Sequence, residues 1–256
     1  MQSPRFFRSI ARSVKLAGIF AYAALQLVFQ RPATRQQRAE WLHLSCARLI
    51  RGMDIDLRLQ GRCPERGFII SNHLGYLDIV AFAALHRCVF VSKDELRTTL
   101  FLGWMTSMAG TVYVDRGRGG SALQARAGMM AAAGDGLPVV FFPEGTTSDG
   151  STVLKFHSGL LAQVMASGQP VTAAHVSYRL TQDNGPGVTI ASHVAFWDDT
   201  PLLLHIFRVL ALRGIAVEVR FAGAPIAFSE GPAQRKLAAI EARAAVLALC
   251  AEDEAP

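Results

Sequence analysis

The chain has 256 residues, of which 51% are hydrophobic and 18% charged, and its formal net charge is +6 at neutral pH. Its length suits one large domain, or one domain with a small appendage, and its apolar content is ample for a sizeable core. The low charged fraction and a mean hydropathy of +0.26 point to association with a membrane. The positive charge flanks an apolar stretch and accompanies no nucleic-acid recognition motif, which argues against a nucleic-acid partner.

The first predicted element is an apolar segment, residues 16–29, which contains no charged side chain. Its basic neighbours all precede the first acidic residue and are Arg5, Arg8, Arg12, Lys15, Arg31, Arg35 and Arg38. Basic side chains beside an apolar segment suit the anionic cytoplasmic leaflet, where each adds about 1 kcal/mol of attraction. The segment is shorter than the roughly 17–25 residues that span a bilayer. It therefore lies in the interface, enters and returns, or spans at a tilt.

We interpret this segment as an uncleaved membrane anchor. A cleaved signal peptide is one alternative, but its small-residue site, Ala21-Tyr22-Ala23, follows only the five apolar residues 16–20, too few for a signal core. A helix packed against the protein's own core is the other alternative.

Residues 33–53 show helical periodicity. Their apolar stripe consists of Leu42, Cys46, Leu49, Ile50 and Met53. Together with the preceding segment they predict a helical hairpin whose turn lies near Arg31-Pro32. Residues 55–61 alternate strictly between apolar and polar, which indicates a half-buried strand. We therefore expect membrane-associated helices over residues 1–53 and a single catalytic domain over residues 54–256.

The rest of the chain alternates between strand and helix patterns. The predicted strands lie near residues 67–71, 88–92, 111–114, 138–142, 171–176, 187–191 and 216–221. The predicted helices lie near residues 77–86, 94–108, 120–133, 156–167, 202–211 and 232–250. This order predicts an α/β fold with a mixed, mostly parallel sheet covered by helices.

Cysteines and most histidines carry no chemical signature. The cysteines are Cys46, Cys63, Cys88 and Cys250, and they have neither disulfide nor metal-ligand spacing. We expect them to be small core residues or free thiols in a reducing compartment. Four histidines without a carboxylate at a fixed spacing, expected to be structural, are His157, His175, His193 and His205.

The first candidate for chemistry is the pair His73 and Asp78, which follows the apolar run 68–70. A histidine can take a proton from a hydroxyl and return it, and a carboxylate on its other nitrogen stabilises the imidazolium. Residues five apart on a helix differ by about 140° in direction. His73 must therefore lie in a loop, with Asp78 in the first turn of the next helix reaching back. The alternative is a loop histidine beside an aspartate that only favours the helix N-terminus.

Two further segments follow predicted strands. Glu144, Gly145 and Thr146 come after the apolar run 139–142 and offer a carboxylate, a flexible backbone and a hydroxyl to a polar headgroup. A turn with local side-chain hydrogen bonds is the alternative for them. Arg116 ends the strand pattern of residues 110–114. Its planar fork suits a phosphate, although a surface arginine would look the same.

In order and spacing, these three blocks resemble the glycerolipid acyltransferases, in particular the bacterial 1-acyl-sn-glycerol-3-phosphate (lysophosphatidic acid) acyltransferases. The resemblance covers residues 40–225, and the segments 93–96 and 156–159 also fit it. Three motifs in the right order make a chance agreement improbable.

The resemblance implies a role for each residue. His73 would be the general base for the acceptor hydroxyl and Asp78 would orient it. The acyl donor would be a thioester, acyl-CoA or acyl carrier protein, used without a covalent acyl-enzyme, a metal or another cofactor. The residues implied in acceptor binding are Arg116, Lys93, Glu144, Gly145 and Thr146. The implied place is the cytoplasmic face of the bacterial inner membrane, with membrane lipids as partners.

Two departures from the family pattern concern the acceptor. Ala173 occupies a position where a second proline is common, and residues 196–201 leading to His205 look more like relatives that acylate other lysolipids, such as lyso-ornithine lipid. A hydrolase with a serine nucleophile is disfavoured because the chain has no Gly-x-Ser-x-Gly elbow. A non-enzymatic membrane-binding protein is the alternative from another class.

Overall fold

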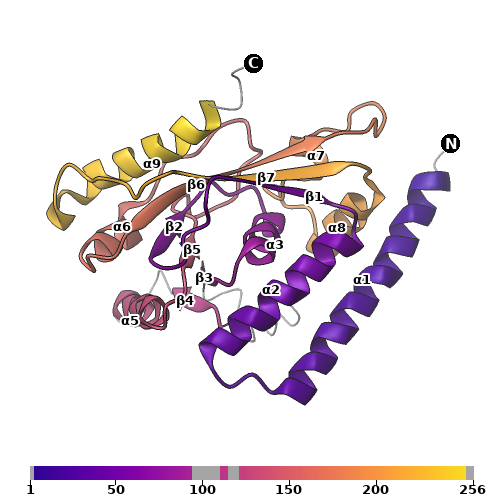
Figure 1. Cartoon of the computed structure of the whole chain (residues 1–256). Coiled ribbons are helices and arrows are strands. Elements are labelled where there is room, and N and C mark those ends of the chain that lie inside the picture. Colours follow the sequence, from indigo (N-terminus) through magenta and orange to yellow (C-terminus); the bar gives the residue numbers. More distant parts are fainter. Residues whose placement is uncertain (1–2, 94–109, 115–120, 252–256) are drawn as a thin grey trace.

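The computed structural model describes residues 3–93, 110–114 and 121–251. Its first two helices, α1 (Ser3–Gln30) and α2 (Arg35–Gly52), form the expected hairpin and lie side by side (Figure 1). Arg31 has a positive φ of 43° where α1 ends, and Pro32 follows it. Thr34 then starts α2 with a capping box, because its side chain accepts a hydrogen bond from the amide of Gln37 at 3.2 Å and the Gln37 side chain accepts one from the amide of Thr34.

Seven strands within the described residues form one sheet. They are β1 (Asp56–Gln60), β2 (Phe68–Ile70), β3 (Val89–Lys93), β4 (Val112–Val114), β5 (Val139–Phe141), β6 (Val171–Leu180) and β7 (Ile215–Phe221). The spatial order is β1-β7-β6-β2-β5-β3-β4. The β6–β7 pair is antiparallel and the other neighbouring pairs are parallel. Strands β2, β3, β5 and β6 run in the same direction. Their carboxyl ends therefore lie at the same edge of the sheet.

Helices cover both faces of the sheet (Figure 1). One face carries α1 and α2 with α3 (Tyr76–Leu85) and α8 (Leu202–Ala211), and the other carries α5 (Ser121–Gly134), α6 (Ser158–Met165) and α9 (Arg235–Ala251). Successive side chains of strand β2 point alternately to the two helical layers. Ile69 belongs to the core beneath α3, whereas Phe68 and Ile70 belong to the core beneath α5, α6 and α9. Strands β2 and β5 are buried on both sides, as central parallel strands usually are.

The expected α/β fold with a mixed, mostly parallel sheet is confirmed. The strand predicted at residues 187–191 is wrong. Those residues lead into a short helix, α7 (Ile190–His193), because the Thr189 side chain accepts a hydrogen bond from the amide of Ser192 at 3.1 Å and caps it. The helix predicted at residues 94–108 lies outside the described residues. A short 3-10 turn, η2 (Pro232–Gln234), precedes α9, and the domain division at residue 54 stays a prediction.

Candidate active site

His73 and Asp78 meet where β2 passes through a loop into α3. His73 lies in the loop and Asp78 in the first helical turn, and the Nδ1 atom of His73 is 2.7 Å from the Oδ2 atom of Asp78. The Asp78 side chain is fully buried, whereas the His73 side chain is 18% exposed. With Nδ1 donating to the carboxylate, Nε2 carries the lone pair. The pair is therefore arranged to accept a proton on Nε2 of His73 and to stabilise the imidazolium that results.

Four donors surround the buried Asp78 carboxylate. Besides His73, Oδ2 accepts from the amides of Leu74 at 2.6 Å and Gly75 at 3.0 Å. The hydroxyl of Tyr178, on β6, donates to Oδ1 at 2.5 Å. Burial, and then the nearby charge of Asp78, raises the pKa of Tyr178, so the phenol stays protonated and can keep donating. Sequence reasoning missed Tyr178, because nothing in its local pattern indicates that it lies beside a residue 100 positions earlier.

The loop that carries His73 is fixed from three sides. Asn72 binds the backbone of Val176 on β6 with two hydrogen bonds, of 2.9 and 2.8 Å. The amide of Ser148 donates to the carbonyl of His73 at 2.9 Å. The imidazole stacks on the ring of Phe142 at a centroid distance of 3.9 Å and an angle of 9°. The histidine is consequently oriented by β2, β6 and the loop after β5, which limits the reorganisation needed in a reaction.

Glu144 follows β5 at the same edge of the sheet and is buried. Its Oε1 atom accepts a hydrogen bond from the amide of Leu154 at 3.2 Å, and Oε2 has no hydrogen-bond partner among the described residues. Burial raises the pKa of Glu144 to about 7, although the backbone amides of Leu154 and His73 oppose the shift; the charge of Asp78 adds to it. Gly145 adopts the left-handed region with a φ of 69°, which turns the chain and leaves Thr146 exposed.

The remaining predicted site residues are only partly located. Lys93 is the last residue of β3, a strand parallel to β5, so its backbone lies at the same edge of the sheet as the loop after β2. The side chain of Lys93 and the whole of Arg116 lie outside the described residues. Within those residues, no three His, Cys, Asp or Glu side chains gather as a metal site.

His205, which we expected to be structural, is buried and holds the start of α3 in place. Its Nδ1 atom lies 3.1 Å from the Tyr76 hydroxyl and its Nε2 atom 3.0 Å from the carbonyl oxygen of Ala195. The next residue, Phe196, donates its amide hydrogen to the carbonyl of Leu74 at 2.7 Å. Helix α8 is thereby tied to the loop that carries His73.

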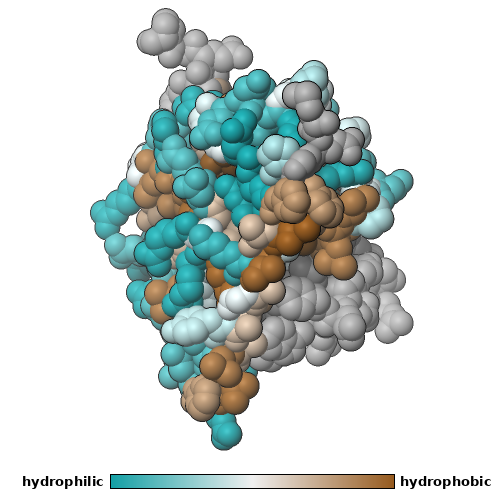
Figure 2. Space-filling view, turned by 90° about the vertical axis from the view of Figure 1, so that its right-hand side faces the viewer, coloured by the Kyte–Doolittle hydropathy of each residue, from teal (hydrophilic) through white to brown (hydrophobic). Residues whose placement is uncertain are grey.

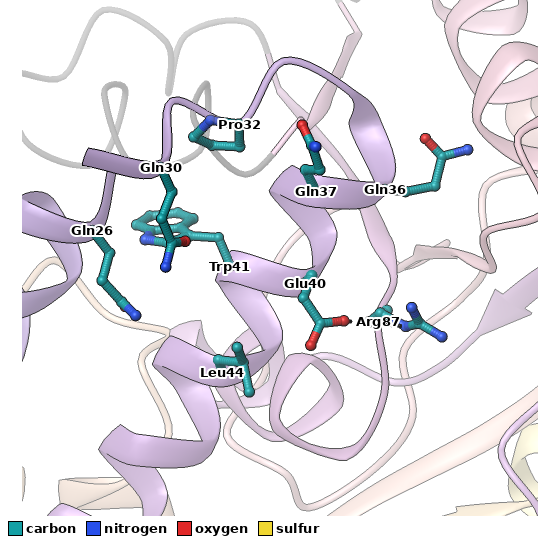
Figure 3. A pocket seen from close by; sticks show the side chains of 9 residues that line it. All are labelled: Gln26, Gln30, Pro32, Gln36, Gln37, Glu40, Trp41, Leu44 and Arg87. Atoms are coloured by element: carbon teal, nitrogen blue, oxygen red, sulfur yellow. Dashed lines mark ion pairs between the residues drawn. The ribbon is translucent and has the colours of Figure 1, made fainter. Parts of the chain in front are cut away.

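A groove of about 450 Å³ lies elsewhere, between the end of α1 and the start of α2 (Figure 3). Glu40 and Arg87 form an ion pair of 3.5 Å at its side, and Trp41 lines it. Arg87 precedes β3 whereas His73 follows β2, and both strands are parallel to β5. The groove and His73 therefore lie at opposite ends of these strands, and the groove is not part of the candidate site.

Comparison with known proteins agrees with this arrangement. The family model named Acyltransferase matches residues 55–177. The chain is 32% identical to the lyso-ornithine lipid O-acyltransferase of Rhodobacter capsulatus, over 88% of this chain and 82% of that protein. It is 27% identical to the 1-acyl-sn-glycerol-3-phosphate acyltransferase of Neisseria gonorrhoeae, over 66% of this chain and 65% of that protein.

The fold is also that of a solved relative. The crystal structure of the 1-acyl-sn-glycerophosphate acyltransferase from Thermotoga maritima superposes with a TM-score of 0.64, at 17% identity, over 96% of this chain and 98% of that one. The chain belongs to the acyltransferase family. Within that family it is a glycerolipid acyltransferase of the group that acylates lysolipids, as the resemblance of its motifs indicated.

Proposed function

We propose that the protein transfers a fatty acyl group from a thioester, acyl-CoA or acyl carrier protein, to the free hydroxyl of lyso-ornithine lipid. The 32% identity with an enzyme of that name favours this acceptor, as do the departures from the family pattern around Ala173 and residues 196–201. Lysophosphatidic acid, the first expectation from the motifs, is the second candidate, and the 27% identity with the Neisseria enzyme favours it.

The hydrogen bond between His73 and Asp78 carries the proposal. In the proposed reaction, Nε2 of His73 takes the proton of the acceptor hydroxyl while the oxygen attacks the thioester carbonyl. The tetrahedral intermediate collapses, the carbon–sulfur bond breaks, and the thiolate takes the proton from the imidazolium. An ester and a free thiol result, and His73 returns to its neutral form.

Acceptor binding follows from the remaining residues of the site. We propose that Arg116, with Lys93, binds the anionic group of the acceptor, since a guanidinium fork fits a carboxylate as well as a phosphate. Glu144, Gly145 and Thr146 complete the binding of the headgroup. Supporting this, Glu144 keeps a buried oxygen, Oε2, without a hydrogen-bond partner among the described residues.

We further propose that the enzyme works at the cytoplasmic face of the membrane, where thioester donors are made. Residues 4–30 form a helix that is long and apolar enough to cross a bilayer, and only 11% of its most apolar window is buried. The alternative of a helix packed on the protein's own core applies to part of it, since Ala23 and Leu27 are buried. Figure 2 shows apolar side chains gathered on the side of the molecule where α1 lies.

The test uses the full chain in detergent with labelled acyl-CoA or acyl carrier protein, and offers lyso-ornithine lipid and lysophosphatidic acid in parallel. Substitution of His73 by alanine should lower turnover about 10²–10⁴-fold, the usual contribution of a general base. His86→Ala, at the other end of α3, is the matched control and should keep the wild-type rate. Acylation of neither lipid would refute the function, and a fully active His73→Ala enzyme would refute the role of the histidine.

A further inference from the structure

An exposed apolar surface runs from α1 onto α8. The Phe6 ring packs edge-on against the ring of Phe207 on α8, at a centroid distance of 6.1 Å. Leu203, one turn before Phe207, is 80% exposed. We call this surface the α1–α8 strip, and it consists of Phe6, Phe7, Ile10, Val14, Leu203 and Phe207. Figure 2 shows a patch of brown side chains near the centre of this face, bordered by teal ones.

The two helices that form the strip are joined by hydrogen bonds to the end of α8. Arg8 donates to the carbonyl of Ala211 at 2.7 Å, and Arg12 to that of Leu212 at 2.5 Å. The hydroxyl of buried Ser9 donates to the carbonyl of Phe207 at 3.0 Å. The two arginine bonds satisfy carbonyl groups at the end of α8, which a helix leaves without partners. The strip is consequently one continuous surface built on two helices that are fixed to each other.

Positive charge borders the strip. Arg5, Arg12 and Arg213 are close enough to Arg8 that, after burial, their charges lower its pKa. No carboxylate forms an ion pair with any of these four arginines within the part of the chain that the structure describes. An apolar surface bordered by arginines matches a bilayer whose headgroups are anionic, because the apolar side chains enter the acyl region and the arginines stay at headgroup level.

We propose that α8 is a second membrane-contacting element and that the α1–α8 strip binds the surface of an anionic phospholipid bilayer. The inference rests on the proposed function only in taking the bilayer as the source of the acceptor. The opposite face of α8 contacts the segment that holds the catalytic loop. His205 on that face is bonded to Tyr76, and Phe196 is bonded to the loop of His73. Contact through α8 therefore brings the catalytic loop to the bilayer from which a lysolipid has to come.

Vesicle sedimentation of the full chain tests this proposal. The vesicles contain phosphatidylcholine alone, which is neutral, or phosphatidylcholine with about one third phosphatidylglycerol, which is anionic. Leu203→Glu adds a charge to the strip and leaves α1 unchanged, and we expect it to weaken binding to the anionic vesicles about tenfold or more. Ile240→Glu is the matched control, since Ile240 on α9 is an exposed apolar residue, 65% exposed, outside the strip. It should bind as the wild type does.

Three readouts separate the outcomes. Acylation in detergent micelles should be the same for Leu203→Glu and the wild type, because the substitution does not touch the site. Unchanged vesicle binding by Leu203→Glu would overturn the inference while leaving the proposed function intact. A change in oligomeric state without a change in vesicle binding would also overturn it, because the strip would then be an interface between two copies. The vesicle result decides the inference whichever lysolipid is acylated.

Discussion

Tyr178→Phe is the substitution that probes the site most selectively, because it removes one oxygen and keeps the ring. In the wild type, the buried hydroxyl donates to Oδ1 of Asp78 at 2.5 Å. Phenylalanine fits the same space, so Oδ1 loses its donor while the hydrogen bonds of Oδ2 to His73 and the two amides remain. The ionised carboxylate then has one stabilising partner fewer.

The size of the effect follows from that lost bond. A hydrogen bond to a charged group contributes about 1.5–3 kcal/mol, and its loss leaves the buried Oδ1 atom of Asp78 without this donor. We therefore expect the free energy of unfolding of Tyr178→Phe to fall by about 1.5–3 kcal/mol. Because the hydrogen bond between Oδ2 of Asp78 and His73 remains, kcat/KM for acylation should fall by less than about tenfold, which corresponds to about 1.4 kcal/mol.

The assays are urea unfolding and kcat/KM for acylation in detergent, with Tyr22→Phe as the matched control. Tyr22 is an exposed tyrosine on α1 that keeps its ring contact with Arg48 after this change. The control should retain the wild-type stability and rate. A loss of stability under about 0.5 kcal/mol for Tyr178→Phe would refute the importance of the bond to Asp78. A fall in rate as large as that of His73→Ala would mean that Tyr178 does more than hold Asp78.

Two further substitutions test how the surroundings of the site hold it together. Asn72→Ala leaves the buried amide and carbonyl of Val176 without their two side-chain partners, so urea unfolding should show a loss of about 2–4 kcal/mol; a loss under about 0.5 kcal/mol would contradict this. Burial raises the pKa of Glu144 to about 7 in the folded protein, above its value in the unfolded chain. Between these two values the folded state binds a proton that the unfolded state has lost. The free energy of unfolding should therefore fall as pH rises from about 5 to 7. Glu144→Gln should flatten that fall, and an unchanged slope would assign it to another group.

Contacts between residues near in sequence were predictable, and contacts across the sheet were not. The placement of His73 in a loop and Asp78 in a first helical turn follows from the 100° step of a helix, and the structure has that arrangement. The partners Tyr178 and Val176 depend on β6 lying beside β2. Strand order is set by packing of the whole core, so no local pattern around residue 178 reveals that its hydroxyl meets Asp78.

Two differences at element level have different causes, the first local and the second long-range. Residues 188–190 all have β-branched side chains, which favours a strand prediction. The side chain of Thr189 instead accepts a hydrogen bond from the amide of Ser192, the side chain of Ser192 accepts one from the amide of Thr189, and a helix begins there. Helix α1 begins at Ser3 and is longer than the apolar segment 16–29. The sequence presents Arg8 and Arg12 only as basic residues before that segment. Their hydrogen-bond acceptors at the end of α8 lie some 200 residues further along the chain, so no local pattern reveals them.

The two buried carboxylates at this edge of the sheet differ in what they can still bind. Asp78 is surrounded by four donors, so it can orient His73 but has little capacity left for a substrate. Glu144 accepts a hydrogen bond from the Leu154 amide, and burial raises its pKa to about 7, so near neutral pH it can offer a headgroup a protonated oxygen or an ionised one. Tyr178→Phe removes a donor of Asp78, and Glu144→Gln removes the group whose pKa lies near 7. The double variant should therefore combine the loss of stability of the first substitution with the flattened pH dependence of the second. A pH dependence as steep as that of the wild type would mean that it belongs to a group other than Glu144.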